Sequence, residues 1–207
     1  MRFEFIQETG SNIPIPGNYK DSIELIRSDY YRYKGRKTSI FMMWVYSMLT
    51  SNFGFNFWIR LASVRGWLMP IAKFMHRMYY LRYGLQITPE TKIGYGLYIS
   101  HGFGTFVNPS AIIGNNCNIS QCSTIGANFE DAAIIGDNVY IGTNVCVIGH
   151  IVVQNTSSIG AGAVVVKDVP ENATVAGVPA KIISYENPGR FVENRYDTRK
   201  HSTPDKK

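Results

Sequence analysis

The chain has 207 residues, enough for one or two domains with a substantial core. Hydrophobic residues make up 45% and charged residues 17%, a balance typical of globular proteins and not of disordered ones. The net charge of +6 would favour an acidic partner, such as a phosphorylated cofactor, an anionic sugar polymer or a membrane face. The sequence lacks the glycine-rich basic stretches and base-stacking motifs of nucleic-acid-binding proteins, which argues against that function.

The first 20 residues predict an irregular lead-in, because they contain Gly10, Pro14, Pro16 and Gly17. They also lack the apolar stretch of a signal peptide, so we expect a cytoplasmic protein. Its three cysteines have no zinc-binding spacing, which predicts reduced thiols and no metal; they are Cys117, Cys122 and Cys146.

Four helices are expected before residue 85. Apolar residues at helical spacing predict the first over Ser22–Tyr33. Two further helices are expected over Ser39–Thr50 and Phe55–Val64. Pro70 suits the first turn of a fourth helix that ends at about Tyr83, with Gly84 as its C-cap.

The segment Thr38–Ile59 carries no charge and is long enough to cross a bilayer. Polar residues such as Ser47, Asn52 and Asn56 interrupt its apolar character, however. We therefore expect two buried or interfacial helices here, and leave peripheral attachment to the inner face of the membrane open.

From Ile93 to Val165 an aliphatic residue returns every six positions, often followed by glycine. Two intervals are longer: eight residues from Ile99 to Val107 and ten from Ile125 to Ile135. A period of six fits neither a helix nor a single strand and is typical of a hexapeptide-repeat β-helix. The two long intervals predict loops that leave the solenoid.

A second position of the hexapeptide supports the same fold. Three residues after the aliphatic position the chain repeatedly has glycine or asparagine, which tolerate the left-handed backbone of a tight corner; these residues are Gly96, Gly102, Asn116, Asn128, Asn138, Asn144 and Gly162. Three hexapeptides make one triangular turn, so the array predicts about four turns. The expected architecture is mainly β, with a helical region at residues 1–85, a parallel β-helix at 86–185 and a polar tail at 186–207.

Three stretches resemble the serine acetyltransferase branch of the hexapeptide acyltransferases. They are Ile93 to His101 (IGYGLYISH), Ile113 to Gly126 (IGNNCNISQCSTIG) and Gly177 to Lys181 (GVPAK). The resemblance covers about residues 85–185 and implies a left-handed β-helix, a homotrimer and acetyl transfer from acetyl-CoA to a hydroxyl without metal.

The resemblance places the catalytic base at His101, at the mouth of the first loop; a neutral imidazole takes the hydroxyl proton, which suits a side chain that titrates near neutral pH. His150, at another predicted corner, is the competing candidate, whereas His76 and His201 attract no role. The branch has aspartates where this chain has Ser100 and Gln86.

A second histidine and an arginine that bind the amino acid in this branch are also missing from the loop at residues 127–133. These departures favour a sugar acceptor in a capsular or other surface polysaccharide. The alternatives are serine O-acetylation in cysteine synthesis and a non-catalytic scaffold or binding module.

The remaining candidate residues fall into two groups. Those expected to orient the base or shape the acceptor pocket are Gln86, Ser100, Asn108, Gln121, Thr124 and Asn128, together with the loop residues Phe103, Glu130 and Asp131. Those that the resemblance assigns to acetyl-CoA are Thr143, Ala161, Val166, Lys167 and Lys181. Thr143 and Ala161 are eighteen residues apart, one full turn, and we expect them to stack on one edge of the solenoid.

Overall fold

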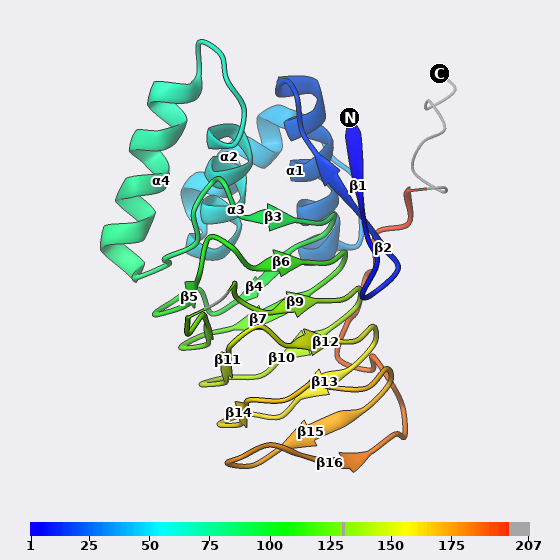
Figure 1. The fold of residues 1–207 in the computed structure, drawn as a ribbon. Helices are drawn as coiled ribbons and strands as arrows, with labels where there is room; N and C mark the ends of the chain where they lie inside the picture. The colour runs from blue at the N-terminus through cyan, green and yellow to red at the C-terminus, as the bar shows by residue number, and fades with distance from the viewer. Residues whose placement is uncertain (130, 199–207) are drawn as a thin grey trace.

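A computed structural model describes residues 1–129 and 131–198. It shows a helical layer over one end of a β-solenoid, with an N-terminal hairpin along one side (Figure 1). The helices are α1 (Tyr19–Lys34), α2 (Ile40–Leu49), α3 (Ser51–Ala62) and α4 (Met69–Tyr83). The two helices expected within Thr38–Ile59 are thus confirmed as α2 and α3, and none of the helices in the described part of the chain is long and apolar enough to cross a membrane.

The solenoid consists of three parallel sheets that share a triangular section. The first face holds β3 (Lys92–Ile93), β6 (Ile112–Ile113), β9 (Ile134–Ile135) and β12 (Val152–Val153). The second holds β4 (Tyr98–Ser100), β7 (Asn118–Ser120), β10 (Tyr140–Ile141), β13 (Ser158–Ile159), β15 (Thr174–Ala176) and the antiparallel β16 (Lys181–Ser184). The third holds β5 (Phe106–Val107), β8 (Thr124–Gly126), β11 (Cys146–Ile148) and β14 (Val164–Val165).

The hexapeptide aliphatics form one continuous core. Ile99, Ile119, Ile141 and Ile159 are fully buried and stack through adjacent coils of the second face. A solenoid buries its apolar side chains only by stacking, so each coil depends on its neighbours. The third face has four strands, one per coil, and the fold class and the turn count expected from the repeat are confirmed.

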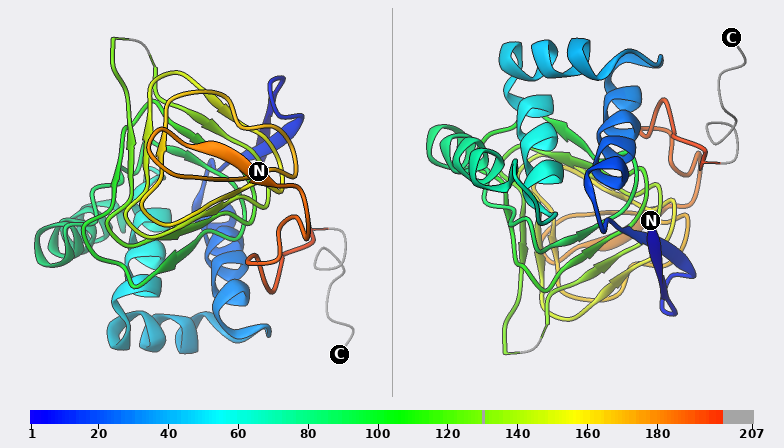
Figure 2. Two further views of the ribbon diagram at one scale, coloured as in Figure 1. Left: turned by 90° about the horizontal axis from the view of Figure 1, so that it is seen from below. Right: turned by 90° about the horizontal axis from the view of Figure 1, so that it is seen from above.

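Most corners follow the expected chemistry. Positive φ angles occur at Gly96, Asn116, Asn138, Asn144 and Gly162. The expectation was wrong at Gly102 and Asn128, where the chain enters a loop instead of a tight corner, and His101 takes a left-handed conformation in place of Gly102. The described residues of the second loop, 127–129 and 131–133, lie where the chain extends from the solenoid in Figure 2.

The irregular lead-in expected for the N-terminus was also wrong. Arg2–Ile6 (β1) and Ser11–Ile15 (β2) form an antiparallel hairpin. Ile6 and Ile13 pack against Ile134 of the solenoid, so burial of alternate residues outweighs the turn-forming prolines. Pro14 is tolerated because a two-stranded ribbon leaves half of its amide groups unpaired.

The C-terminal segment up to residue 198 runs back along the second face. Tyr196 is buried, and its backbone exchanges two hydrogen bonds with the side chain of Asn116. The carbonyl oxygen of Glu193 accepts a hydrogen bond from Nε of Arg32 at 2.8 Å. This face of the solenoid is therefore covered by the protein's own chain; residues 199–207, which include His201, lie outside the described part.

Candidate active site

His101 lies directly after β4, where the chain leaves the second face. Its φ of 50° is a conformation uncommon for residues other than glycine, asparagine and aspartate, and its side chain is exposed. The next amide, of Gly102, donates a hydrogen bond to Oδ1 of Asn52 at 2.8 Å. Asn52 belongs to the first turn of α3, so the helical layer fixes the backbone at His101.

The C-terminus of α4 holds the other end of the same loop. The amide of Gly104 donates to the carbonyl oxygen of Tyr83 at 2.9 Å. Gly84 caps α4 in the left-handed conformation, as expected, and a β-carbon there would lie 3.5 Å from Gly104. The loop after His101 is thus anchored to two helices, and sequence analysis missed both anchors because no local motif links these segments.

His101, Gln121, Thr143 and Ala161 stand one above another on a single edge of the solenoid. Each of them comes three positions after a strand residue of the second face. These strand residues pair in register, Tyr98 with Asn118, Asn118 with Tyr140 and Tyr140 with Ser158. Backbone bonds continue the stacking into the edge, from Asn144 N to Gln121 O at 3.0 Å and from Gly162 N to Thr143 O at 2.8 Å. We call this column the His101 edge.

Gln121 contributes an unusual group to the His101 edge. Its side-chain oxygen Oε1 is buried and has no hydrogen-bond partner within the described part of the chain. An unsatisfied buried carbonyl costs about 1–3 kcal/mol and therefore calls for a role. Gln121 lies one coil below His101 on the same edge, so this unpaired acceptor lies in the column that includes the histidine.

Gln86 and Ser100 flank His101 on two different faces. Gln86 bridges to Phe106 and begins the third face, while Ser100 ends β4 and pairs with Ser120. Among the described residues neither side chain forms a hydrogen bond with the imidazole of His101. Ser100 directly precedes His101 in the chain, whereas Gln86 lies on the neighbouring face.

A second edge lies where the third face ends. It includes other residues that the sequence predicted for the acceptor pocket. Oδ1 of Asn108 accepts hydrogen bonds from the amide and the hydroxyl of Ser110, so this side chain is occupied in a local turn. Asn128 is exposed in the loop, beside Phe129, and Glu130 lies outside the described residues. We call this column, with His150 and Lys167, the loop edge.

His150 was expected at a left-handed corner, but that was wrong. The positive φ belongs to the preceding Gly149, at 94°, because glycine adopts this conformation without strain. Nδ1 of His150 lies 3.4 Å from the carbonyl oxygen of Ala132, so the ring contacts the loop base. His101 and His150 therefore occupy different edges of the solenoid.

The residues assigned to acetyl-CoA span the third face between the two edges. Thr143 and Ala161 lie on the His101 edge, as expected from their spacing, whereas Val166 and Lys167 follow β14 at the loop edge. The segment before Lys181 extends the same face, since Ala180 N donates to Val164 O at 2.8 Å. The exposed Lys167 and Lys181 both lie at the end of the solenoid away from the helices, near β14 and β16.

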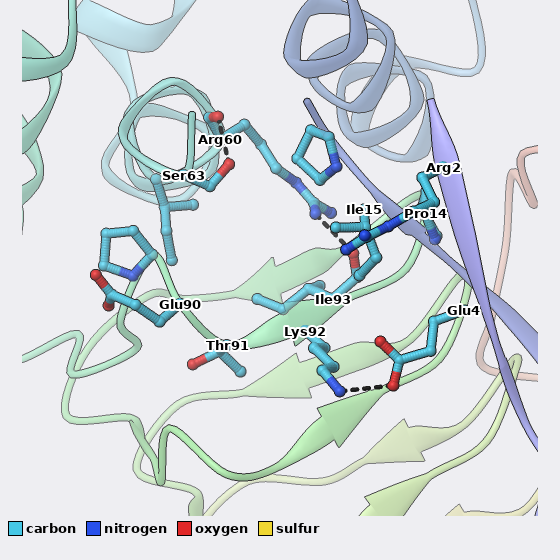
Figure 3. A pocket seen from close by; sticks show the side chains of 13 residues that line it. Arg2, Glu4, Pro14, Ile15, Arg60, Ser63, Glu90, Thr91, Lys92 and Ile93 are labelled. Carbon is cyan, nitrogen blue, oxygen red and sulfur yellow. Dashed lines mark hydrogen bonds and ion pairs between the residues drawn. The ribbon is translucent and has the colours of Figure 1, made fainter. Parts of the chain in front are cut away.

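A pocket of about 230 Å³ lies away from these residues, between the N-terminal hairpin, the end of α3 and β3 (Figure 3). Lys92 and Glu4 form an ion pair at its rim, and Arg60 and Glu90 also line it. None of the expected catalytic or cofactor residues reaches it. The described residues also contain no cluster of three or more side chains suited to a metal ion.

Comparisons with known proteins point to one enzyme family. No family model matches the chain. A serine acetyltransferase from Staphylococcus epidermidis is 35% identical over 125 residues, which cover 58% of each chain. The crystal structure of serine acetyltransferase from Brucella abortus superposes with a TM-score of 0.67 and 31% identity, covering 80% of this chain and 70% of that one.

This chain is a homologue of the serine acetyltransferases. It shares their hexapeptide-repeat β-solenoid, and a serine acetyltransferase structure in complex with CoA also superposes, with a TM-score of 0.63 and 26% identity over 79% of this chain and 70% of that one. The chain spans about half the length of the curated relatives it matches, 48% and 58% of the first two.

The comparisons overturn the polysaccharide acceptor expected from Ser100 and Gln86. The relatives are named for serine, with 33% identity over 117 residues and 38% over 104 residues in two of them. The expectation rested on the lack of a few charged contacts around one histidine. Such differences alter how an imidazole is oriented, but they do not identify a sugar as acceptor.

Proposed function

We propose that this serine acetyltransferase homologue is an acetyl-CoA-dependent O-acetyltransferase that acetylates the hydroxyl of L-serine. The observation that carries the proposal is the His101 edge, which stacks an exposed histidine, an unpartnered buried oxygen and two of the residues assigned to acetyl-CoA, Thr143 and Ala161, in consecutive coils. The names of the homologues supply the acceptor.

His101 acts as the general base in the proposed reaction. Its imidazole accepts the proton of the serine hydroxyl while the oxygen attacks the carbonyl carbon of the thioester. The carbon–sulfur bond then breaks, the acetyl group stays on the serine oxygen, and the imidazolium returns its proton to the CoA thiolate. The fixed backbone around His101 favours this role, because a base held by α3 and α4 loses little freedom when substrate binds.

Acetyl-CoA is expected to lie along the third face. Backbone groups at Thr143 and Ala161 would bind the pantetheine arm, beside Val166, and the ammonium groups of Lys167 and Lys181 would meet the phosphates at the end away from the helices. This direction puts the thioester toward His101, which lies near the helical end of the same edge.

The serine carboxylate requires a cation that the loop at residues 127–133 does not supply. Arg82 is a candidate, because it precedes Tyr83, whose carbonyl oxygen bonds the loop after His101. Nε of Arg82 donates to the hydroxyl of Tyr83 at 3.2 Å, and the guanidinium remains exposed. Gln121 would accept a hydrogen bond from the serine ammonium through its free Oε1.

A homotrimer with each site between neighbouring solenoids is part of the proposal. The second face is covered by the C-terminal segment, whereas the third face has side chains that are exposed or partly exposed, at Phe106, Thr124, Cys146 and Val164. A neighbour packed there would place its own side chains against His101.

Thiol release from acetyl-CoA by the purified protein tests the proposal. L-serine should support release, whereas L-alanine, which has no hydroxyl, should not. His101→Asn should abolish release, and Arg82→Gln should raise KM for L-serine by about tenfold without a comparable change in KM for acetyl-CoA.

Two outcomes would contradict the proposal. Release with other alcohols but not with serine would keep the acetyltransferase chemistry and reject the acceptor. Failure to bind CoA in calorimetry, by protein with its native Tm, would reject the enzyme and favour a non-catalytic scaffold.

A further inference from the structure

Helix α2 is apolar around nearly its whole circumference, and yet little of its surface is buried against the rest of the protein. Its sequence, IFMMWVYSML, has no charged residue, and only Met43 and Ser47 are buried. Phe41 is 64% exposed and Leu49 76% exposed. A soluble helix normally has a polar face toward solvent, so this exposure calls for a partner.

Helix α4 and the turn before it carry a second apolar stripe. Its residues alternate by four and three positions, which places them on one side of a helix; they are Trp67, Ile71, Phe74, Met78 and Leu81, all exposed. The side buried against α3 is the opposite one, with Ala72 and His76. The exposed stripe therefore does not contribute to packing within the helical layer.

The two apolar surfaces belong to neighbouring helices. The hydroxyl of Tyr79 on α4 donates to the carbonyl oxygen of Ser47 on α2 at 2.7 Å. Figure 2 shows α2 as the outermost element of the helical layer, with α4 at the adjoining corner. We call the exposed apolar residues of α2 and α4, with the basic residues around them, the apolar-basic face.

The charge of this region has a single sign. Residues 30–89 contain no aspartate or glutamate and nine lysines and arginines, more than the net charge of +6 of the whole chain. Two of the nine, Arg32 and Arg60, are buried in the protein. The exposed ones precede α2, precede α4 or flank the α4 stripe; they are Lys34, Arg36, Lys37, Arg65, Lys73, Arg77 and Arg82.

We propose that the apolar-basic face binds the surface of an anionic lipid bilayer. Aromatic side chains such as Trp44 and Trp67 would enter the headgroup boundary, and the surrounding cations would meet lipid phosphates. The helices lie on the membrane and do not cross it, in keeping with their length and hydropathy.

Charge argues against a second copy of the chain as the occupant. Two apolar-basic faces in contact would bring like charges together without an acidic residue between 30 and 89 to offset them. An anionic bilayer supplies the complementary sign and an apolar layer of any required extent. Of the residues of this face only Arg82 also belongs to the proposed site, and none of the residues on α2 or in the α4 stripe does, so the proposal does not depend on the reaction at His101.

Sedimentation of the full chain with vesicles tests the proposal. We expect binding to vesicles of phosphatidylcholine with phosphatidylglycerol and at least tenfold weaker binding to phosphatidylcholine alone. Raising the salt from about 0.1 M to about 0.5 M should weaken the binding to anionic vesicles, since screening acts on exposed charges.

Two variants should separate the apolar and the basic contributions. Phe74→Glu should reduce partition into anionic vesicles by about tenfold or more, because it places a carboxylate in the stripe. Lys73→Gln with Arg77→Gln should reduce it by a similar factor. Phe5→Glu is the matched control, since Phe5 is 62% exposed on the N-terminal hairpin and Phe74 is 64% exposed; this control should bind as the wild type does.

Equal binding to neutral and anionic vesicles, or no binding to either, would overturn the proposal. So would a Phe74→Glu protein that changes its mass in light scattering and still binds vesicles as before, because that result would assign the face to contacts between subunits. Thiol release with L-serine, measured on the same samples, distinguishes a misfolded variant from a folded variant that no longer binds the bilayer.

Discussion

Arg60 of α3 holds the carboxylate of Asp29 of α1 with two hydrogen bonds, Nε to Oδ2 at 2.9 Å and Nη2 to Oδ1 at 3.1 Å. Both side chains are buried. Arg60 also donates to the carbonyl oxygens of Ile93 and Gly94, and Asp29 accepts from the amide of Leu97. The ion pair therefore joins two helices to the first coil of the solenoid, next to the strand that leads to His101.

Removal of one partner of this ion pair should destabilise the protein strongly. We expect Asp29→Ala to lower the free energy of unfolding by about 3–5 kcal/mol, because it leaves the guanidinium of Arg60 buried without a counter-charge. Urea denaturation followed by circular dichroism measures this change. Arg60 also lines the pocket of Figure 3, so its displacement would reach the N-terminal hairpin.

The exposed pair of Arg27 and Glu24 on α1 offers a control. Their charged atoms are 3.8 Å apart and both side chains are substantially exposed. Arg27→Ala should change stability by no more than about 0.5 kcal/mol. A cost below about 1 kcal/mol for Asp29→Ala would show that the buried pair does not hold the helical layer.

His101→Asn should separate catalysis from folding. Asparagine tolerates the left-handed backbone that His101 adopts, so the Tm should change little. The loss of the general base should lower kcat by about 10²–10⁴-fold. Thiol release and a thermal melt on the same preparation measure both effects.

Two further substitutions sharpen this test. His101→Val should lower the Tm as well, because a β-branched residue at positive φ costs about 1–3 kcal/mol. His150→Asn should retain most activity, since His150 lies at the loop edge and contacts Ala132. Full activity of His101→Asn together with loss of activity in His150→Asn would transfer the base to the other edge.

The repeat alone predicts most of the solenoid, because its signal is local and redundant. An aliphatic residue and a corner residue in each hexapeptide fix the coil, and register then follows from stacking, as it does for Thr143 and Ala161. The hairpin of β1 and β2 is different, since its strands depend on burial of Ile6 and Ile13 against a residue more than a hundred positions away. A pattern within twenty residues cannot reveal that contact.

In the candidate site, too, the sequence predicts some residues and not others. His101 was predicted from a motif within one stretch of chain, and the structure places it at a loop with an exposed imidazole. The roles of Asn52 and Tyr83 depend on the packing of α3 and α4 over the first coil, which no spacing in the sequence encodes. The predicted polysaccharide acceptor was wrong because the prediction inferred the whole acceptor pocket from two side chains, Ser100 and Gln86.

Thiol chemistry should distinguish the three cysteines. Burial raises the pKa of the Cys117 thiol to about 12, and its Sγ donates to the carbonyl oxygen of Gly136. Cys122 is exposed and Cys146 partly exposed. A thiol reagent such as DTNB should therefore modify Cys122 rapidly and Cys146 more slowly in the native protein, and Cys117 only after unfolding. Rapid modification of all three in native protein would contradict the buried position of Cys117.

Acidification should weaken the packing of α4 on the solenoid through His76. Nε2 of His76 lies 2.8 Å from the carbonyl oxygen of Ile87, which can only accept, so Nε2 carries a hydrogen. Burial lowers the pKa of His76 below its usual value of 6.5, and the hydrogen bond to Ile87 only partly offsets this effect. The unfolded chain therefore takes up the proton first as the pH falls.

This difference in pKa gives the sign of the pH dependence. The stabilisation from neutral His76 is complete above about pH 6.5 and is lost as the pH falls through the lower folded-state pKa. Urea unfolding at pH 7 and pH 5 should show lower stability at pH 5, and His76→Gln, which keeps a donor for Ile87 without a titrating ring, should reduce the difference. An unchanged difference in that variant would mean that other groups cause the acid sensitivity.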